Sequence, residues 1–453
     1  MSRTHQIAQP NSSANMPRLS PPPAVLEIAE RLENAGFEAW CVGGAIRDAL
    51  LGHPDLDWDL ATSATPDQVR QLFGHKRTIP VGIAFGTVGV LDRANTMHEV
   101  TTFRRDVRTD GRHAEVEFGV SLEDDLARRD FTINAIAYSP KRDELRDPFG
   151  GRADLARRLV RAVGDPDARM REDRLRALRA IRFAARFDFA LDPATLVAIE
   201  ASAPHLGRLS AERVKQELDK TMEQVRRPST ALLHWRETGA FRTLVPQLAD
   251  VSEQTLRIAD YAAMPGVPRR PARRAIRFAA LLSELSGREA AKVMTNLRSS
   301  KHEIHAVEAL VDRWRSFGGD LRDLLSRAAP PSDAEVRRSV ARVGRLHLGA
   351  FMRLASAAWC AEGGGAPGQA AVGSLYRRML RAAFDQPVDI GSLAIDGDDL
   401  RGVGIQPGPA LGKILQALLD VVIDDPARNT ADWLLQEAKR LHEQAGSGDR
   451  RAP

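Results

Sequence analysis

The chain has 453 residues, 43% of them hydrophobic, and is long enough for about three or four structural units with sizeable cores. Its only two cysteines, Cys41 and Cys360, exclude a disulfide framework and fit a reducing cytoplasm. No run of about 18 apolar residues occurs, which argues against a membrane span, and the net charge of +5 suits a polyanionic partner.

The first 20 residues are rich in Ser, Asn, Gln and Pro and contain no acidic residue. This composition predicts a disordered extension over residues 1–22. An organellar presequence remains an alternative, which the prolines and the sparse arginines make a poor fit. From residue 23 to residue 160, helix and strand patterns mix and predict an α+β head.

A strand, a Gly-Gly turn and a helix follow one another early in this head. Residues 37–42 have strand character, and Gly43 and Gly44 allow the backbone to turn sharply and present its NH groups to an anion. The helix expected over residues 45–51 points its positive end at the same place, where Arg47 can bond a phosphate oxygen. The pattern predicts a phosphate cradle, although a Gly-Gly turn alone is more often a simple loop.

Two aspartates follow on a predicted strand. Residues 55–60 alternate strictly, which places Leu56, Trp58 and Leu60 in the core and puts the aspartates on the opposite face. Asp57 and Asp59 can share a pair of magnesium ions, because hard divalent cations prefer carboxylate and phosphate oxygens. An Asp-x-Asp pair is usually a solvated turn, but its position just after the Gly-Gly turn favours a metal site.

Two further strands are predicted over residues 82–91 and 97–103. The second carries Glu99, our candidate for a third metal-binding carboxylate if this strand lies beside the one with the aspartates. A solvent-facing strand glutamate is the alternative. Residues 104–113 then form a charged run with almost no apolar anchor, which predicts a mobile segment or, more simply, a solvated hairpin loop.

The head is expected to close with a buried helix beginning within residues 131–138 and with turn residues at 147–151. A helix is expected over residues 171–186. On it, Asp173 and Arg176 would lie side by side and offer both kinds of hydrogen bond to a flat base. An amphipathic helix with a surface ion pair explains the same residues.

Beyond residue 160 the pattern is helical almost throughout. We expect a neck over residues 161–260, a body over 261–375 and a tail over 376–447, with Ser210 as the N-cap of a helix over 211–225. The glycine-rich stretch 363–368 reads as an exposed linker within the body.

Four segments carry a family resemblance, namely GGAIRDALLG (43–52), LDWDLAT (56–62), RRDFTINAIA (128–137) and EDRLRALR (172–179). In this order, over about 140 residues, they resemble the class II tRNA nucleotidyltransferase and bacterial poly(A) polymerase family. The resemblance implies a polymerase-β-like nucleotidyltransferase head, followed by an all-α neck, body and tail that binds tRNA.

The resemblance also implies roles for individual residues. Gly44 and Arg47 would hold the triphosphate, and Asp57 and Asp59 two Mg²⁺ ions. Arg129 of the RRD motif would contact the incoming nucleotide, and Asp130 and Asn134 would order the sugar side of the pocket. A protein template for the base would consist of Asp173 and Arg176, and its face would continue with Arg179 and Arg182.

Other segments resemble the family less completely. The charged run is similar to the flexible loop of CCA-adding enzymes, except that His113 replaces a proline. Ser283 and Glu284 stand where some relatives carry a His-Asp dyad, so we expect no phosphohydrolase activity there, because serine cannot replace an imidazole ligand. Residues 404–413 resemble part of the tail of CCA-adding enzymes. They would either contact an RNA phosphate or start a helix that packs in the tail.

The implied activity is addition of CCA to the 3′ end of tRNA from CTP and ATP, in the cytoplasm and with release of pyrophosphate. Alternatives are a poly(A) polymerase, a CC- or A-adding enzyme and, more remotely, a non-catalytic RNA-binding protein. No protein partner is inferred.

Overall fold

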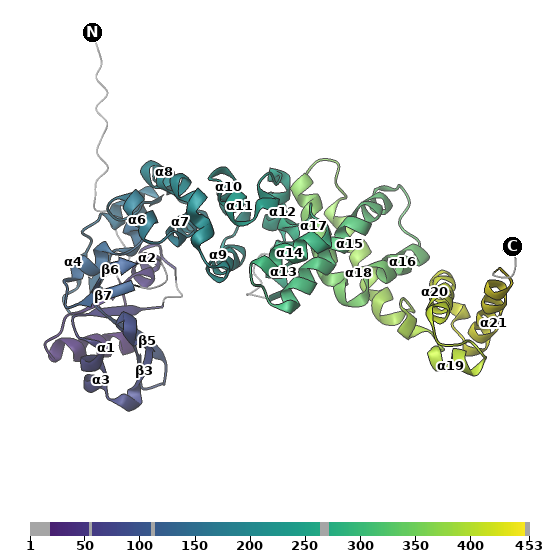
Figure 1. Ribbon diagram of the computed structural model, residues 1–453, viewed down its shortest axis with the longest axis horizontal. Coiled ribbons are helices and arrows are strands. Elements are labelled where there is room, and N and C mark those ends of the chain that lie inside the picture. The colour runs from purple at the N-terminus through teal and green to yellow at the C-terminus, as the bar shows by residue number, and fades with distance from the viewer. Residues whose placement is uncertain (1–18, 54–56, 110–113, 263–270, 449–453) are drawn as a thin grey trace, which may run out of the picture. The chain divides into compact units, whose positions relative to one another are not determined.

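The computed structural model describes residues 19–53, 57–109, 114–262 and 271–448. The chain divides into two compact units (Figure 1). One comprises Met1–Glu217 and Glu237–Leu244, and the other comprises Leu218–Arg236 and Val245–Pro453. No helix in the described part of the chain combines the length and the apolar character needed to cross a membrane.

The first unit is built around a seven-stranded mixed sheet with the strand order β3-β4-β5-β2-β1-β8-β9. Only β2 and β5 run parallel, and every other neighbouring pair is antiparallel. The strands are β1 (Ala39–Val42), β2 (Asp59–Thr62), β3 (Thr78–Gly82), β4 (Thr87–Leu91), β5 (Met97–Thr102), β8 (Ala137–Ser139) and β9 (Glu144–Arg146).

Helices cover the two faces of this sheet unequally. On one face, α1 (Pro23–Asn34) contacts β1 and β2, and α3 (Pro66–Phe73) contacts β4 and β5 (Figure 1). The strand residues that point to this face, such as Leu60 and Val100, are fully buried. On the other face, Leu122 and Leu126 of α4 (Leu122–Ala127) pack only over the β1–β2–β8 side. On the β3–β4–β5 side of the sheet, the large side chains of Ile79, Val81 and Met97 are exposed.

Burial within the sheet determines the chemical state of Cys41. Cys41 lies in β1 and is fully buried, and burial, with a smaller effect of Asp59, raises the pKa of its thiol to about 12. Cys41 is therefore a residue of the sheet core. Cys360 is only partly buried.

Three expectations for the head need correction or completion. Residues 131–138 do not start a buried α-helix: they form a single 3-10 turn, η3 (Thr132–Asn134), and then enter β8. The strand predicted over residues 82–91 is shorter, because η2 (Ile83–Phe85) precedes β4. The charged run forms a two-stranded hairpin of β6 (Arg104–Thr109) and β7 (Ala114–Phe118), whose tip, with His113, lies outside the described residues.

Helices complete the first unit. They are α2 (Gly44–Leu50), α5 (Gly151–Arg157), α6 (Pro166–Glu172), α7 (Leu175–Phe187), α8 (Pro193–Ser202), the first part of α9 (Ala211–Gln224) and α11 (Ala240–Leu244), with the short strands β10 (Leu159–Val160) and β11 (Ala190–Leu191) and the 3-10 turns η1 (His75–Arg77) and η4 (Ala203–Arg208). The turn at residues 147–151 starts α5, since Asp147 accepts from the backbone NH of Gly151 at 2.6 Å.

The second unit is helical throughout its described part (Figure 1). Its helices include α10 (Pro228–Glu237), α12 (Glu253–Tyr261), α13 (Pro271–Leu281), α14 (Gly287–Asn296), α15 (Lys301–Ser326), α16 (Asp333–Val343), α17 (Leu348–Glu362), α18 (Gln369–Asp385), α19 (Gly397–Gly402), α20 (Pro409–Asp424) and α21 (Ala431–Gly448), with 3-10 turns η5 (Pro246–Leu248), η6 (Arg345–His347), η7 (Ile390–Ser392) and η8 (Pro426–Arg428). The loop at residues 363–368 separates α17 from α18, as predicted.

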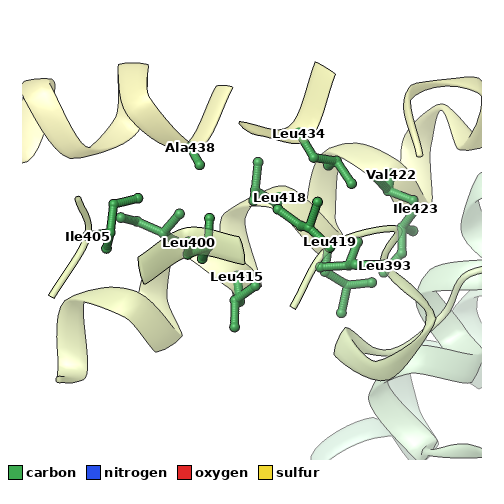
Figure 2. Close-up of a cluster of buried hydrophobic side chains, with 12 residues drawn as sticks. Leu393, Leu400, Ile405, Leu415, Leu418, Leu419, Val422, Ile423, Leu434 and Ala438 are labelled. Carbon is green, nitrogen blue, oxygen red and sulfur yellow. The ribbon is translucent and has the colours of Figure 1, made fainter. Parts of the chain in front are cut away.

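The last three helices have an apolar core of their own. Figure 2 shows Leu434 and Ala438 of α21 facing side chains such as Leu418 of α20 and Leu400 of α19. Gly408, at φ 157°, precedes Pro409, which begins α20. The glycine-proline motif at residues 404–413 thus starts a helix of this core. The assignment of residues 376–447 as a tRNA-binding tail stays a prediction.

Candidate active site

The Gly-Gly turn follows β1 directly and lies against an arginine. Gly43 has φ 77° and ψ −137°, a conformation that residues with a side chain rarely adopt. A Cβ atom added to Gly43 would lie 3.2 Å from Nη1 of Arg129. The bare backbone and the guanidinium are therefore neighbours, which is an arrangement suited to an anionic ligand.

This close approach gives a prediction. Gly43→Ala should raise the KM for the nucleotide about tenfold, because it combines a strained positive φ with a methyl group pressed against Arg129. Gly52→Ala is the matched control: Gly52 also has a positive φ, of 76°, but no atom within 4 Å of the added Cβ. Steady-state kinetics with CTP would show the difference, and equal KM values for the two variants would contradict it.

Two of the three candidate carboxylates lie on adjacent strands, and the third lies just before one of them. Asp57 lies two residues before β2 and is exposed, Asp59 begins β2, and the buried Trp58 lies between them. The parallel pairing of Leu60 with Val100 sets Asp59 beside Glu99 of β5, on the same face of the sheet. The predicted alternation thus holds over residues 57–60, while Asp55 and Leu56 lie outside the described residues.

The electrostatics of Asp59 reflect this crowding. Burial, followed by repulsion from Asp57 and Glu99, raises the pKa of Asp59 to about 7, although Arg129 lowers it. Such closely spaced hard oxygen donors fit a divalent cation of the Mg²⁺ type. Within the described ranges, no three His, Cys, Asp or Glu side chains stand close enough together to ligate one ion. Glu99 therefore acts on Asp59 through space, and its role as a ligand remains a prediction.

Because its pKa is raised, Asp59 is expected to lower the stability of the folded protein at high pH. Folded Asp59 keeps its proton up to pH of about 7, whereas an unperturbed aspartate loses it near 3.8. The folded state binds more protons across this window, so its stability falls as pH rises through it. In EDTA at pH 8, Asp59→Asn should raise the Tm by a few degrees, and the gain should shrink towards pH 5. The same gain at both pH values would argue against the raised pKa.

Arg47 is buried in a polar chain that crosses the head. Its side chain is 4% exposed, Nη1 donates to Oδ1 of Asn134 at 2.6 Å, and Nε donates to Asp48. Asn134 donates to Oδ1 of Asp130 at 2.9 Å, and Oδ2 of Asp130 accepts from Nη2 of Arg179 at 2.6 Å. The role of Arg47 as a triphosphate contact stays a prediction, because its guanidinium also lies against the rings of Phe183 and Phe187.

Asp130 is ionised within this chain. Burial alone would raise its pKa, but the Arg179 guanidinium and the Asn134 amide outweigh burial, and the pKa is lowered. The charge of Asp130, the last residue of the RRD motif, holds the Arg179 guanidinium in place. The structure thus brings together Arg47, Asn134, Asp130 and Arg179.

Asp125 was missed by the sequence interpretation. It is fully buried in α4, its Oδ2 accepts from Nη2 of Arg129 at 3.0 Å, and its Oδ1 accepts from Nη2 of Arg128 at 2.7 Å. These ion pairs lower its pKa against the opposing effect of burial. Asp125 orients the arginine that faces the Gly-Gly turn. An acidic residue three and four positions before an Arg-Arg pair was the available signal.

The template residues do not share a helix as expected. α6 ends at Glu172 with Asp173 as its C-cap, and α7 begins at Leu175, so the predicted helix over residues 171–186 is broken at this point. The Asp173 side chain causes the break locally, because Oδ1 accepts from the backbone NH of Leu175 at 3.0 Å and so competes with helical bonding.

Asp173 and Arg176 are each held by other partners. Oδ2 of Asp173 accepts from Nη2 of Arg213 at 2.8 Å, a partner that the sequence did not indicate. Arg176 donates to Oε2 of Glu172 at 2.7 Å and to the carbonyl oxygen of Arg128 at 3.0 Å. Both side chains are fixed before any base arrives, as a template needs, but the structure does not pair them with each other.

Arg182 is held in a buried ion pair. Its Nε donates to Oε2 of Glu217 at 2.6 Å, and the two side chains are 4% and 2% exposed. This buried ion pair joins α7 to α9. Arg182 as a nucleotide contact therefore stays a prediction that its burial does not favour.

Comparison with known proteins agrees with this geometry. Residues 39–161 match the family model for the poly A polymerase head domain, and residues 188–251 match that for a probable RNA and SrmB-binding site of polymerase A. A CCA-adding enzyme of Latilactobacillus sakei is 36% identical over 419 residues, which cover 91% of this chain and 97% of that protein. One from Geobacillus thermodenitrificans is 45% identical over 238 residues, or 52% of this chain and 57% of that protein.

A solved structure extends the likeness to the fold. The Bacillus stearothermophilus CCA-adding enzyme in complex with CTP is 31% identical, has a TM-score of 0.72, and is matched over 98% of its chain and 95% of this one.

A mixed sheet that presents paired aspartates beside a Gly-Gly turn, with a helical remainder, is the architecture of a nucleotidyltransferase. The 36% identity to the Latilactobacillus sakei enzyme, over nearly the whole length of that protein, shows which family of nucleotidyltransferases is meant. The chain belongs to the class II tRNA nucleotidyltransferase and poly(A) polymerase family and is similar to its CCA-adding enzymes.

Proposed function

We propose that this protein adds cytidine, cytidine and adenosine to the 3′ end of tRNA, using CTP and ATP and releasing pyrophosphate. The observation that carries the proposal is the row formed by the Gly43 turn with Arg129, the aspartates of β2 and Glu99 of β5. The relative that matches over 97% of its length has the name CCA-adding enzyme, which supports the choice of reaction.

Different parts of the row act on different parts of the substrates. The backbone of Gly43 and Gly44 and the Arg129 guanidinium bind the triphosphate. Asp57 and Asp59, with Glu99 beside them, would hold two Mg²⁺ ions. When bound, such ions lower the pKa of an attacking hydroxyl and neutralise the leaving pyrophosphate. The 3′ hydroxyl of the RNA is the nucleophile.

Base selection falls to Asp173 and Arg176. An acceptor carboxylate and a donor guanidinium can each bond the edge of cytosine or adenine. Arg213 and Glu172 hold these two groups in place. Asp130 orients Arg179, and Glu217 orients Arg182, so those arginines support the wall of the site.

Two rival functions share much of this machinery. Poly(A) polymerase activity is favoured by the description of the family model that matches residues 39–161. Addition of CC or A alone would use the same residues. A non-catalytic RNA-binding protein is disfavoured, because the crowded carboxylates that raise the pKa of Asp59 are costly to keep without a use.

Pyrophosphate release tests the proposed chemistry. The purified protein, incubated with CTP, Mg²⁺ and a tRNA transcript that lacks its last three nucleotides, should release one pyrophosphate per cytidine added. EDTA should stop cytidine addition and pyrophosphate release together. RNA extension without pyrophosphate, or in EDTA, would contradict the proposal.

A further inference from the structure

Three apolar side chains lie exposed on the sheet face that carries the candidate carboxylates. Ile79 and Val81 of β3 are 41% and 47% exposed, and Met97 of β5 is 40% exposed. We call these three residues the apolar shelf. The β3–β4–β5 part of the sheet thus exposes large apolar side chains next to the candidate carboxylates, and a contiguous exposed apolar patch marks a ligand-binding or interaction site.

Strand pairing places the shelf on this face. Gly89 of β4 pairs with Ile79 on one side and with Glu99 on the other, so all three positions point the same way. A Cβ atom on Gly89 would come within 2.6 Å of the Met97 sulfur and 3.0 Å of Val81 Cγ2. Met97 and Val81 therefore close over Gly89 and form one continuous surface.

The apolar shelf lies directly beside the candidate carboxylates. Met97 precedes Glu99 by two residues on β5 and lies on the same face. Beyond Glu99 the face becomes polar, since the hydroxyl groups of Thr87 and Thr101 bond each other at 3.0 Å. Across the sheet, the order is the Gly-Gly turn after β1, the aspartates at the start of β2, then β5 with Glu99 and Met97, and finally β3 with Ile79 and Val81.

This order fixes which substrate can reach the shelf. In phosphoryl transfer the attacking and leaving oxygens lie roughly in line on opposite sides of the phosphorus atom. If the Gly-Gly turn and Arg129 hold the leaving pyrophosphate on the β1 side, the attacking hydroxyl must arrive from the β5 side. The nucleoside that carries this hydroxyl then lies over β5, β4 and β3.

We propose that the apolar shelf of Ile79, Val81 and Met97 binds the unpaired terminal base of the RNA acceptor. The inference rests on the proposed function and adds a subsite to it. A base offers a flat face whatever its identity, so an apolar surface can bind the different terminal bases that successive additions create. The sulfur of Met97 is soft and adapts to such a face.

The test compares acceptor binding in matched variants. Met97→Gln nearly keeps the side-chain bulk and Val81→Gln adds to it, and these changes and the double variant replace apolar contact with a polar amide. Leu26→Gln is the control, because Leu26 is also 40% exposed in the first unit but belongs to α1, which covers the opposite face. The KM for the shortened tRNA transcript and the KM for CTP are measured for addition of the first cytidine.

The double variant should raise the KM for RNA about tenfold, as expected for the loss of a base contact, and leave the KM for CTP unchanged. Leu26→Gln should leave both unchanged. An RNA KM in the double variant equal to that of the control would overturn the inference, as would a parallel rise in the KM for CTP.

Cross-linking of the wild-type protein decides the question even if the variants fold poorly. A transcript ending in 4-thiouridine should cross-link to the peptides that contain residues 79–81 or 97. Cross-links confined to other peptides would overturn the subsite while RNA extension continued. A wild-type protein that extends no RNA would overturn the proposed function itself.

Discussion

Replacing Asp57 by alanine is expected to lower nucleotide addition by at least about a thousandfold while tRNA binding stays within about twofold of the wild type. Asp57 is exposed and lies one position away from the buried Trp58, so its removal takes away an oxygen donor and leaves the core of the sheet intact. Single-turnover assays would measure addition, and filter binding with the shortened tRNA would measure affinity.

A control separates chemistry from charge. Asp67→Ala removes an exposed carboxylate from the first turn of α3, which covers the opposite face of the sheet. It should change neither addition nor binding beyond about twofold, since isolated surface substitutions rarely exceed a few tenths of a kcal/mol. If Asp57→Ala weakened tRNA binding as much as addition, Asp57 would be a structural residue rather than a metal ligand.

Replacing Asp173 by alanine should reduce the discrimination between CTP and ATP about 100-fold at the first addition. Polar groups that read a hydrogen-bonding edge generate large selectivity, because the wrong base leaves a buried partner unpaired. Asp173 is fixed by the backbone NH of Leu175 and by Arg213, so its acceptor geometry is set before the base binds. The ratio of kcat/KM for CTP and ATP measures the effect.

Arg213→Lys provides the discriminating comparison for this prediction. It retains a positive charge near Asp173 but loses the guanidinium geometry, so it should lower the CTP to ATP ratio less than Asp173→Ala does. Asp167→Ala, an exposed change in the first turn of α6, should leave the ratio unaltered. An unchanged ratio in Asp173→Ala would rule out the protein template.

The local pattern of the sequence was sufficient to predict much of the head. The alternation around Trp58 and Leu60 placed those residues in the core, and the strand containing Glu99 is the parallel neighbour of β2. The helical remainder also follows the predicted periodicity. These features depend on spacing over a few residues, which a single sequence displays directly.

Contacts between distant residues could not be predicted in the same way. Arg47 bonds Asn134 from 87 positions away, and Asp173 bonds Arg213 from 40 positions away. Spacing alone suggested that Arg47 can bond a phosphate and that one continuous helix over residues 171–186 carries the template. In the structure, tertiary hydrogen bonds bury Arg47, and the Asp173 side chain interrupts the helix. Residue types suggested the chemistry, but the folded chain decides which partner each charge has.

The length of the product tests the central claim most directly. Purified protein, Mg²⁺ and a tRNA transcript lacking its last three nucleotides would be incubated with CTP alone, with ATP alone and with both. Three additions and no more, reached only with both nucleotides, are the result we expect. A long adenosine tail grown from ATP alone would instead assign the protein to the poly(A) polymerases.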